Sequence, residues 1–411
     1  MPGSLTSAEQ LSSPSVSSAT SSVAASAKGR GVFERLAGSF HIFATVALAL
    51  ALVPAFKAAG LPLRFDWPVY FKLYWISLAL QSIFAAALLY VLSFPIKDTL
   101  GPLWARCRKQ KLLIPLLLTP AILLIAFNGF WAGLAAAVDG IVLIEWFTRS
   151  SSSAPRSRLA ASFSAVALPA LYFFVGFILV LAYNDVIAAA RFDGSYDLIL
   201  NRLDSRLMLG TTVTSLAHLA LAHLPANAAN WFEWIYVLTF PQIGACMIVV
   251  ALRCGQGRAL RFVATLLTAY YIALALFFLL PATGPYYICQ THFALFPNSP
   301  WFYNGQRPLL DAFRVQQRPN LIGLDYFIAF PCMHLAQPIV VLWYLRRWKR
   351  MVAALMAFDL LLIPAILILE QHYAIDLLGG VAVAILALCM VRDRTTAAPG
   401  VAQFQPYAGA V

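Results

Sequence analysis

The sequence predicts an all-α integral membrane protein with about ten transmembrane helices. Of its 411 residues, 61% are hydrophobic and only 11% are charged, which is far less polar than a soluble domain of this length. Apolar stretches of about 17–25 residues, the length that a helix needs to cross a bilayer, recur along the chain. The basic residues cluster in the short segments between these stretches, where they determine the side of the membrane that each segment occupies.

The N-terminal region is expected to be a disordered cytoplasmic tail, because it is rich in Ser and Ala and almost free of bulky apolar side chains. Apolar segments long enough to form helical spans follow it. The stretch from Leu112 to Phe147 exceeds one crossing, and residues 128–130 offer a turn, so we divide it there. The expected spans are Ile42–Ala59, Leu73–Phe94, Leu112–Phe127, Trp131–Phe147, Ala160–Ile187, Trp231–Leu252, Phe262–Leu280, Pro331–Leu345, Val352–Leu369 and Tyr373–Val391.

These spans divide the chain into regions. We expect a disordered tail over residues 1–39, an annex of about four helices over 40–159, a catalytic core of about six helices over 160–394, and a C-terminal tail over 395–411. Within the core, residues 188–230 and 281–326 are too polar or too rich in Pro and Gly to continue a span, and are expected to form long loops.

The distribution of basic residues predicts the topology. With the N-terminus in the cytoplasm, every basic cluster falls on the cytoplasmic side, so we expect both termini there and both long loops outside. These clusters and the anionic headgroups that they meet account for the net charge of +12, so nucleic acid is not an expected partner. The clusters lie within residues 97–111, 149–158, 253–261, 346–350 and 392–394.

Two histidine motifs stand at the expected outer ends of spans in the core. The first, Phe330–His334, reads Phe-Pro-Cys-Met-His, and the second, His372–Asp376, reads His-Tyr-Ala-Ile-Asp. Ionisable side chains are costly at membrane depth, so they mark functional sites there. Two histidines and a carboxylate supply a nucleophile, a group that orients it and a proton donor, which are the parts that covalent phosphoryl transfer needs.

Local geometry makes these motifs more specific. Pro331 suits the first position of a helix, which would place His334 in the first turn, beside backbone N–H groups that can hold phosphate. His372 and Asp376 are four residues apart and would share one face of a helix. The carboxylate could then accept one ring N–H of the histidine while the other nitrogen attacks.

The remaining polar residues give weaker signals. The six cysteines lack CxxC spacing, so neither a metal site nor a disulfide framework is expected. Five charged residues of the first outer loop could bind a polar headgroup, but we interpret them as a solvated surface. His218 and His223 are interpreted as structural or interfacial. The five charged residues are Arg191, Asp193, Asp197, Asp204 and Arg206.

Both histidine motifs resemble signatures of the type-2 phosphatidic acid phosphatase superfamily. Phe330–His334 resembles the second signature, and Glu370–Gly380 resembles the third, in the form of the branch that contains inositol phosphorylceramide synthase-like phosphotransferases. The resemblance covers about residues 160–391. It implies that His372 forms a phosphohistidine, that Asp376 orients it, that His334 protonates the leaving group, and that no metal or other cofactor is needed.

The chain departs from this superfamily in its phosphate-binding residues. Cys332 stands where the second signature has Ser, and residues 281–287, where a cationic first signature is expected, contain no Lys or Arg. A phosphoryl transition state requires positive charge around its oxygens. We therefore expect phosphate to be bound by Cys332 together with arginines of the second outer loop. These arginines are Arg307, Arg314 and Arg318.

The sequence thus predicts a lipid phosphatase or lipid phosphotransferase that acts on a lipid phosphate at the extracytoplasmic leaflet, surrounded by membrane lipids. One alternative is an inositol-phosphoryl transferase to a ceramide-like lipid. An alternative of another class is a non-catalytic lipid transporter or scaffold, which the missing cations favour. The acceptor (water or a hydroxyl), the oligomeric state, any protein partner and the role of the first four spans are left open by the sequence.

Overall fold

The computed structural model describes residues 19–62, 158–225, 228–288, 310–313, 315 and 326–391. These residues form helices joined by loops, and no strand occurs among them, which confirms the all-α prediction for this part of the chain. Four of the helices are long and apolar enough to cross a membrane. The three expected spans between residues 73 and 147 lie outside the described residues.

The helices of the core correspond to the expected spans. Each of the six spans predicted between residues 160 and 391 contains at least one helix. The helices are α1 (Ala19–Ala59), α6 (Arg158–Arg191), α7 (Ser195–Leu207), α8 (Val213–Ala222), α9 (Ala228–Val237), α10 (Thr239–Cys254), α11 (Gln256–Leu279), α12 (Pro285–Ile288), α14 (Met333–Leu345), α15 (Lys349–Ile368) and α16 (Ala374–Met390).

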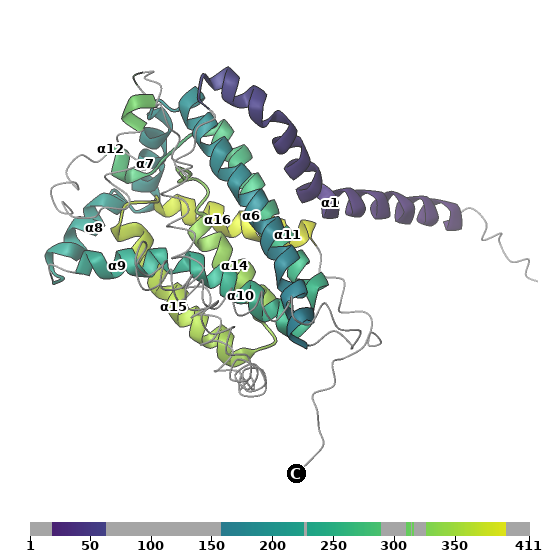
Figure 1. Ribbon diagram of the computed structural model, residues 1–411. Coiled ribbons are helices and arrows are strands. Elements are labelled where there is room, and N and C mark those ends of the chain that lie inside the picture. The colour runs from purple at the N-terminus through teal and green to yellow at the C-terminus, as the bar shows by residue number, and fades with distance from the viewer. Residues whose placement is uncertain are drawn as a thin grey trace, which may run out of the picture.

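The structure differs from the prediction at the start of α1 and in the span expected over Trp231–Leu252. Helix α1 begins at Ala19, so part of the expected disordered tail is helical; this segment is rich in alanine, the strongest helix former, and contains no proline before Pro54. Its N-terminal half projects away from the bundle (Figure 1). The single span expected over Trp231–Leu252 is divided into α9 and α10, because the Pro241 ring would clash with the carbonyl of Val237, where α9 ends.

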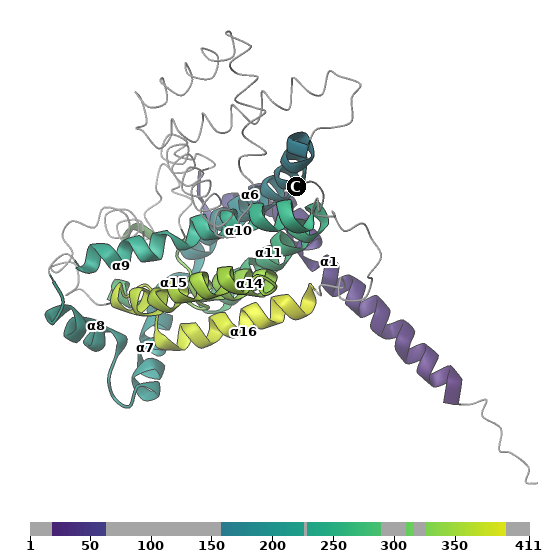
Figure 2. The same cartoon turned by 90° about the horizontal axis from the view of Figure 1, so that it is seen from below.

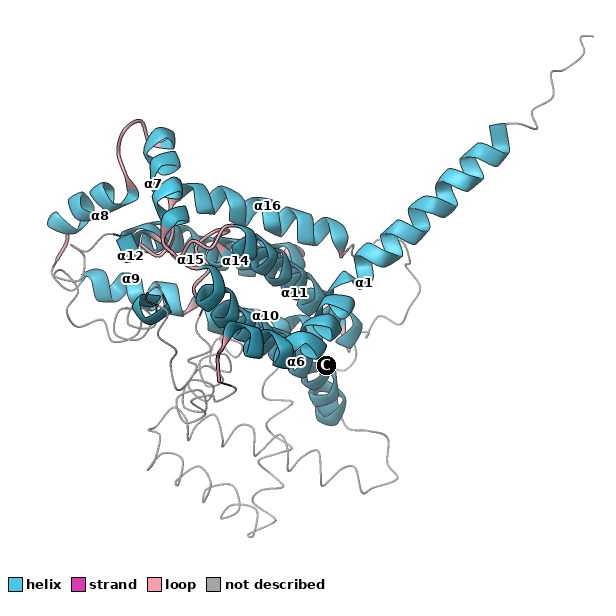
Figure 3. Cartoon of the chain, turned by 90° about the horizontal axis from the view of Figure 1, so that it is seen from above, coloured by secondary structure: helices cyan, strands magenta, loops and turns pink. Residues whose placement is uncertain are grey.

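The segment expected to form the first outer loop, residues 188–230, contains the short helices α7 and α8, which lie at one end of the bundle in Figure 2 and Figure 3. Helix α7 packs against α16 and α12. It buries three side chains at helical spacing, Asp197, Leu200 and Asp204. The prediction that the charged residues of this loop form a solvated surface is therefore wrong for Asp197 and Asp204, both of which are fully buried.

Helix α11 occupies the centre of the bundle and packs against α6, α10, α14 and α16 (Figure 1). Most of its side chains are buried, including Phe262, Leu266 and Tyr270. Polar side chains connect it to α14, since the Gln337 amide donates to the Tyr270 hydroxyl. Hydrogen bonds of this kind between apolar helices replace those that water would otherwise provide.

Helix α16 approaches the start of α14 very closely. A Cβ atom on Gly380 would overlap with the carbonyl oxygen of Cys332, so only glycine allows this approach. The Cys332 N–H donates to the carbonyl oxygen of Asp376 at 3.0 Å. This contact brings the first turns of the two helices, and with them the two histidine motifs, to the same place.

Candidate active site

The two histidines of the motifs are in direct contact. Nδ1 of His334, in the first turn of α14, lies 3.3 Å from Nε2 of His372, which precedes α16. Both side chains are almost completely buried, with 2% and 1% of their surfaces exposed. Residues separated by 38 positions therefore form one pair of imidazoles that can exchange a proton.

The orientation of His372 is set by a backbone carbonyl. Its Nδ1 lies 2.7 Å from the carbonyl oxygen of Ala329. A carbonyl oxygen only accepts hydrogen bonds, so Nδ1 carries a proton and donates it. In the neutral ring, the lone pair is then on Nε2, the nitrogen that faces His334.

Asp376 lies beside His372, as the spacing predicted, but it is not the acceptor nearest to the ring. The carboxylate lies 3.6 Å from Nδ1 of His372, farther than the Ala329 carbonyl. Helix α16 begins only at Ala374, so His372 and Asp376 do not share a helical face. Oδ2 of Asp376 accepts the N–H of Tyr373 at 2.8 Å, as in a capping box, and the same oxygen lies 3.6 Å from Nδ1 of His372.

The first motif also deviates from its predicted geometry. Helix α14 begins at Met333, with Cys332 as its N-cap in an extended conformation, so Pro331 precedes the helix and does not start it. The prediction that His334 lies in the first turn is confirmed. Because the Cys332 N–H is bonded to Asp376, it is not available to phosphate. The Cys332 side chain is buried and interacts with the His372 ring.

An aromatic residue that the sequence did not single out holds the other histidine. Tyr236 of α9 stacks on His334 with ring centroids 3.9 Å apart and an interplanar angle of 27°. The tyrosine is itself 4% exposed, so the stack is shielded from solvent. This contact restricts the His334 ring to one orientation. No pattern in the sequence of α9 distinguishes Tyr236 from the other aromatic residues of that helix.

The two buried carboxylates of α7 contact the segment that carries His372. Asp204 accepts the N–H of Ile375 at 3.1 Å, in the first turn of α16, where the helix dipole favours an anion. Burial raises the pKa of Asp204. The hydrogen bonds from the Ile375 and Ala374 N–H groups lower it, but by less. This buried face could have been predicted from the sequence, because Asp197, Leu200 and Asp204 follow the three- and four-residue spacing of one helical face.

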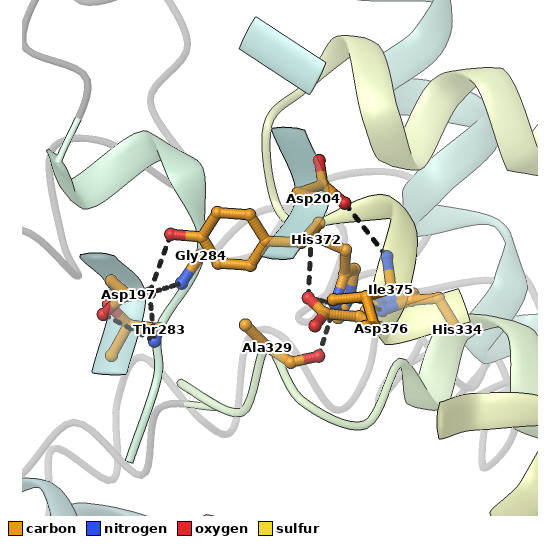
Figure 4. A network of polar contacts seen from close by, with 10 residues as sticks. Asp197, Asp204, Thr283, Gly284, Ala329, His334, His372, Ile375 and Asp376 are labelled. Carbon is orange, nitrogen blue, oxygen red and sulfur yellow. Dashed lines mark hydrogen bonds and ion pairs between the residues drawn. The ribbon is translucent and has the colours of Figure 1, made fainter. Parts of the chain in front are cut away.

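Asp197 contacts the same segment through the side chain of Tyr373. It accepts hydrogen bonds from the N–H groups of Thr283 and Gly284 and from the Tyr373 hydroxyl (Figure 4). The pKa of Asp197 is raised to about 7, mainly by burial. The hydrogen bonds oppose this rise, and the nearby Asp376 carboxylate adds to it. The surroundings of the histidine pair are therefore rich in carboxylates.

Residues 198–390 match the family model of the PAP2 superfamily. The comparisons with curated proteins and with solved structures found no match. The matched segment runs from α7 to the end of α16 and includes both histidine motifs, which supports the resemblance at the level of the superfamily. It does not distinguish the inositol phosphorylceramide synthase-like branch, which stays a prediction.

Two other groups of residues that the sequence singled out are not part of the described site. The loop arginines Arg307, Arg314 and Arg318 lie outside the described residues. His218 is half-buried on α8 and His223 is exposed at its end. Among the described residues, no group of three or more His, Cys, Asp or Glu side chains is arranged to hold a metal ion.

Proposed function

We propose that this protein is a membrane enzyme that transfers the phosphate group of a lipid phosphate through a phosphohistidine on His372. PAP2 superfamily members are usually phosphatases or phosphotransferases, which supports this class of reaction. The observation that carries the proposal is the arrangement of His372: its Nδ1 is held by the Ala329 carbonyl, and its Nε2 faces the second histidine at 3.3 Å. The nucleophilic nitrogen and the proton donor thus face each other directly.

The reaction would proceed in two steps. Nε2 of His372 attacks phosphorus, the bond from phosphorus to the lipid oxygen breaks, and that oxygen takes its proton from His334. Water or a hydroxyl group then attacks the phosphohistidine and gives its proton to His334, which releases His372. The phosphate must separate the two rings to enter, because their facing nitrogen atoms are only 3.3 Å apart. The Asp376 carboxylate, 3.6 Å from Nδ1, would stabilise the positive charge on His372.

The phosphate would be bound by Cys332 and by the loop arginines. The buried Cys332 side chain already interacts with His372. Arg307, Arg314 and Arg318 precede the first motif in the sequence and would replace the cations that residues 281–287 lack.

Neutralising these arginines tests their role. Arg318→Gln combined with Arg307→Gln is expected to lower turnover roughly 10²–10³-fold. Each substitution removes a positive charge that would stabilise the negative phosphoryl oxygens in the transition state. The measurement is phosphate release from one lipid phosphate, with Lys349→Gln on the opposite side of the predicted topology as the control. Wild-type turnover in the double variant would mean that the charge comes from elsewhere.

The proposed site faces the extracytoplasmic side, with both termini in the cytoplasm. The support is that the basic clusters all fall on the other side in the predicted topology. Transfer of an inositol phosphate to a ceramide-like lipid is the more specific alternative. A lipid transporter or scaffold is the alternative of another class; against it, His334 and His372 retain the contact and the fixed ring orientation that catalysis needs.

One assay tests both the reaction and the side of the membrane. A panel of lipid phosphates, including a short-chain, water-soluble and membrane-impermeant one, is given to purified protein with water alone or with a hydroxyl acceptor such as inositol. We expect phosphate release or transfer, and we expect intact cells to process the impermeant substrate. Activity only after permeabilisation would reverse the topology, and no turnover of any lipid phosphate by purified protein would support the transporter or scaffold.

A further inference from the structure

The loop that joins α11 to α12 lies directly against the segment that carries His372. The Tyr286 N–H donates to the carbonyl of Glu370 at 3.0 Å. Gly284 has φ of +118°, and a Cβ atom there would come within 2.6 Å of the Gln371 carbonyl oxygen. A side chain at position 284 would therefore push the loop away. This loop occupies the place in the sequence where the resemblance predicted cations, and it contains none.

The loop is attached to α7 through one fully buried carboxylate. Oδ1 of Asp197 accepts the N–H groups of Gly284 at 2.8 Å and of Thr283 at 3.0 Å. Oδ2 accepts the Thr283 N–H at 3.2 Å and the Thr283 hydroxyl at 3.3 Å. Oδ1 also accepts the hydroxyl of Tyr373, the residue after His372, at 3.2 Å. All of these partners are hydrogen-bond donors, and an ionised carboxylate only accepts hydrogen bonds.

We infer that Asp197 is a positioning residue for phosphoryl transfer, which holds the loop over residues 282–284 and Tyr373 in the places that orient His372. This inference rests on the proposed function. The hydrogen bonds of Asp197 go to Thr283, Gly284 and Tyr373 and to neither histidine, so Asp197 acts through these other groups.

Two short chains of contacts connect Asp197 to His372. In the first, the loop that Asp197 holds presents the carbonyl of Ala282 to the N–H of Ala329 at 3.0 Å. The same Ala329 residue offers its own carbonyl to Nδ1 of His372 at 2.7 Å. In the second, Asp197 binds the side chain of Tyr373, whose backbone N–H is bound by Asp376. The carboxylate is thus connected to the histidine by two routes; Figure 4 shows the bonds of Asp197 to Thr283 and Gly284 and the bond of His372 to Ala329.

Removal of the carboxylate distinguishes positioning from a purely structural role. In Asp197→Ala, the loop and Tyr373 lose their shared acceptor, and we expect kcat to fall about 10–100-fold, since small displacements of a reacting group have effects of this size. KM for the lipid phosphate should stay within about twofold, because lipid binding is not altered. Asp197→Asn keeps an oxygen at the Oδ1 position, and the Thr283 hydroxyl can rotate to accept a hydrogen bond from the new amide. We therefore expect kcat of this variant to be close to that of the wild type.

The matched control is Asp193→Asn. Asp193 lies just before the same helix, is exposed, and accepts the N–H of Ser195 at 2.8 Å, which asparagine can also do. Wild-type kcat is expected in this variant. Thermal unfolding of each purified variant establishes that it is folded. If Asp197→Ala does not fold, Tyr373→Phe, which removes only the hydroxyl that Asp197 accepts, is expected to show a smaller loss of kcat at unchanged KM.

Binding of orthovanadate separates failure of this inference from failure of the proposed function. Vanadate can occupy a phosphoryl-transfer site without turnover, and its affinity is measured by titration calorimetry. We expect Asp197→Ala to bind it about 10-fold or more weakly than wild type and Asp193→Asn to bind it equally. Wild-type kcat and vanadate affinity in folded Asp197→Ala would overturn the inference alone. A wild-type protein that neither turns over lipid phosphates nor binds vanadate would overturn the proposed function and the inference with it.

Discussion

Replacement of His372 by alanine is expected to abolish turnover of lipid phosphates, with a loss of about 10⁴-fold or more in kcat. The reason is that no other described group combines a fixed orientation with a ring nitrogen aimed at the proton donor: Ala329 holds Nδ1, and Nε2 faces His334. Without the imidazole, phosphorus has no protein nucleophile, and direct attack by water at a buried site is slow. The measurement is phosphate release by the purified variant at saturating substrate.

The covalent intermediate provides the sharper readout. Wild-type protein quenched during turnover should carry a phosphate that is labile in acid and stable in alkali, as expected of a phosphohistidine, and His372→Ala should carry none. His223→Ala is the matched control, because this histidine is exposed at the end of α8 and is expected to leave both readouts unchanged. Near-normal turnover, or a phosphorylated enzyme, in His372→Ala would contradict the assignment of the nucleophile.

Replacement of His334 by glutamine is expected to lower kcat about 10²–10⁴-fold for a lipid phosphate. Glutamine has a similar length and can keep a hydrogen bond to His372, but it cannot give a proton to the departing lipid oxygen. An aryl phosphate with an acidic phenol has a leaving group that needs no proton. With this substrate, the variant's rate of phosphoenzyme formation should therefore fall much less. The measurement compares single-turnover rates for the two substrates.

The comparison between leaving groups separates proton donation from a general disturbance of the site. His218→Gln, on α8 and half-buried, is the control for the substitution itself and is expected to retain activity. Equal losses on both substrates in His334→Gln would remove the proton-donor role and leave His334 as a group that orients His372. The stacked Tyr236 ring, 3.9 Å from the His334 ring, would then be part of a support for the nucleophile.

Several features of the protein could be predicted from the sequence because they depend on local properties. The length of the apolar stretches is sufficient to predict a helix in each expected span of the core, since a bilayer requires each span to satisfy its own backbone hydrogen bonds. The two histidine motifs could be found because each is a short pattern within a few residues. Helix ends were less predictable: Pro331 precedes its helix, and Pro241 divides an apolar stretch in two.

Other features were decided only by the tertiary structure, because they join residues that are far apart in the chain. The partner of His372 Nδ1 is a backbone carbonyl 43 positions away, which has no side chain to mark it. Tyr236 reaches His334 from another helix, and Asp197 reaches Tyr373 across 176 positions. Asp197 and Asp204 resemble solvated residues in a polar segment, and they are buried because α7 packs its acidic face onto backbone N–H groups that need acceptors. The sequence by itself determined which chemical groups are present, and the packing of α7, α9, α14 and α16 determined which of them meet.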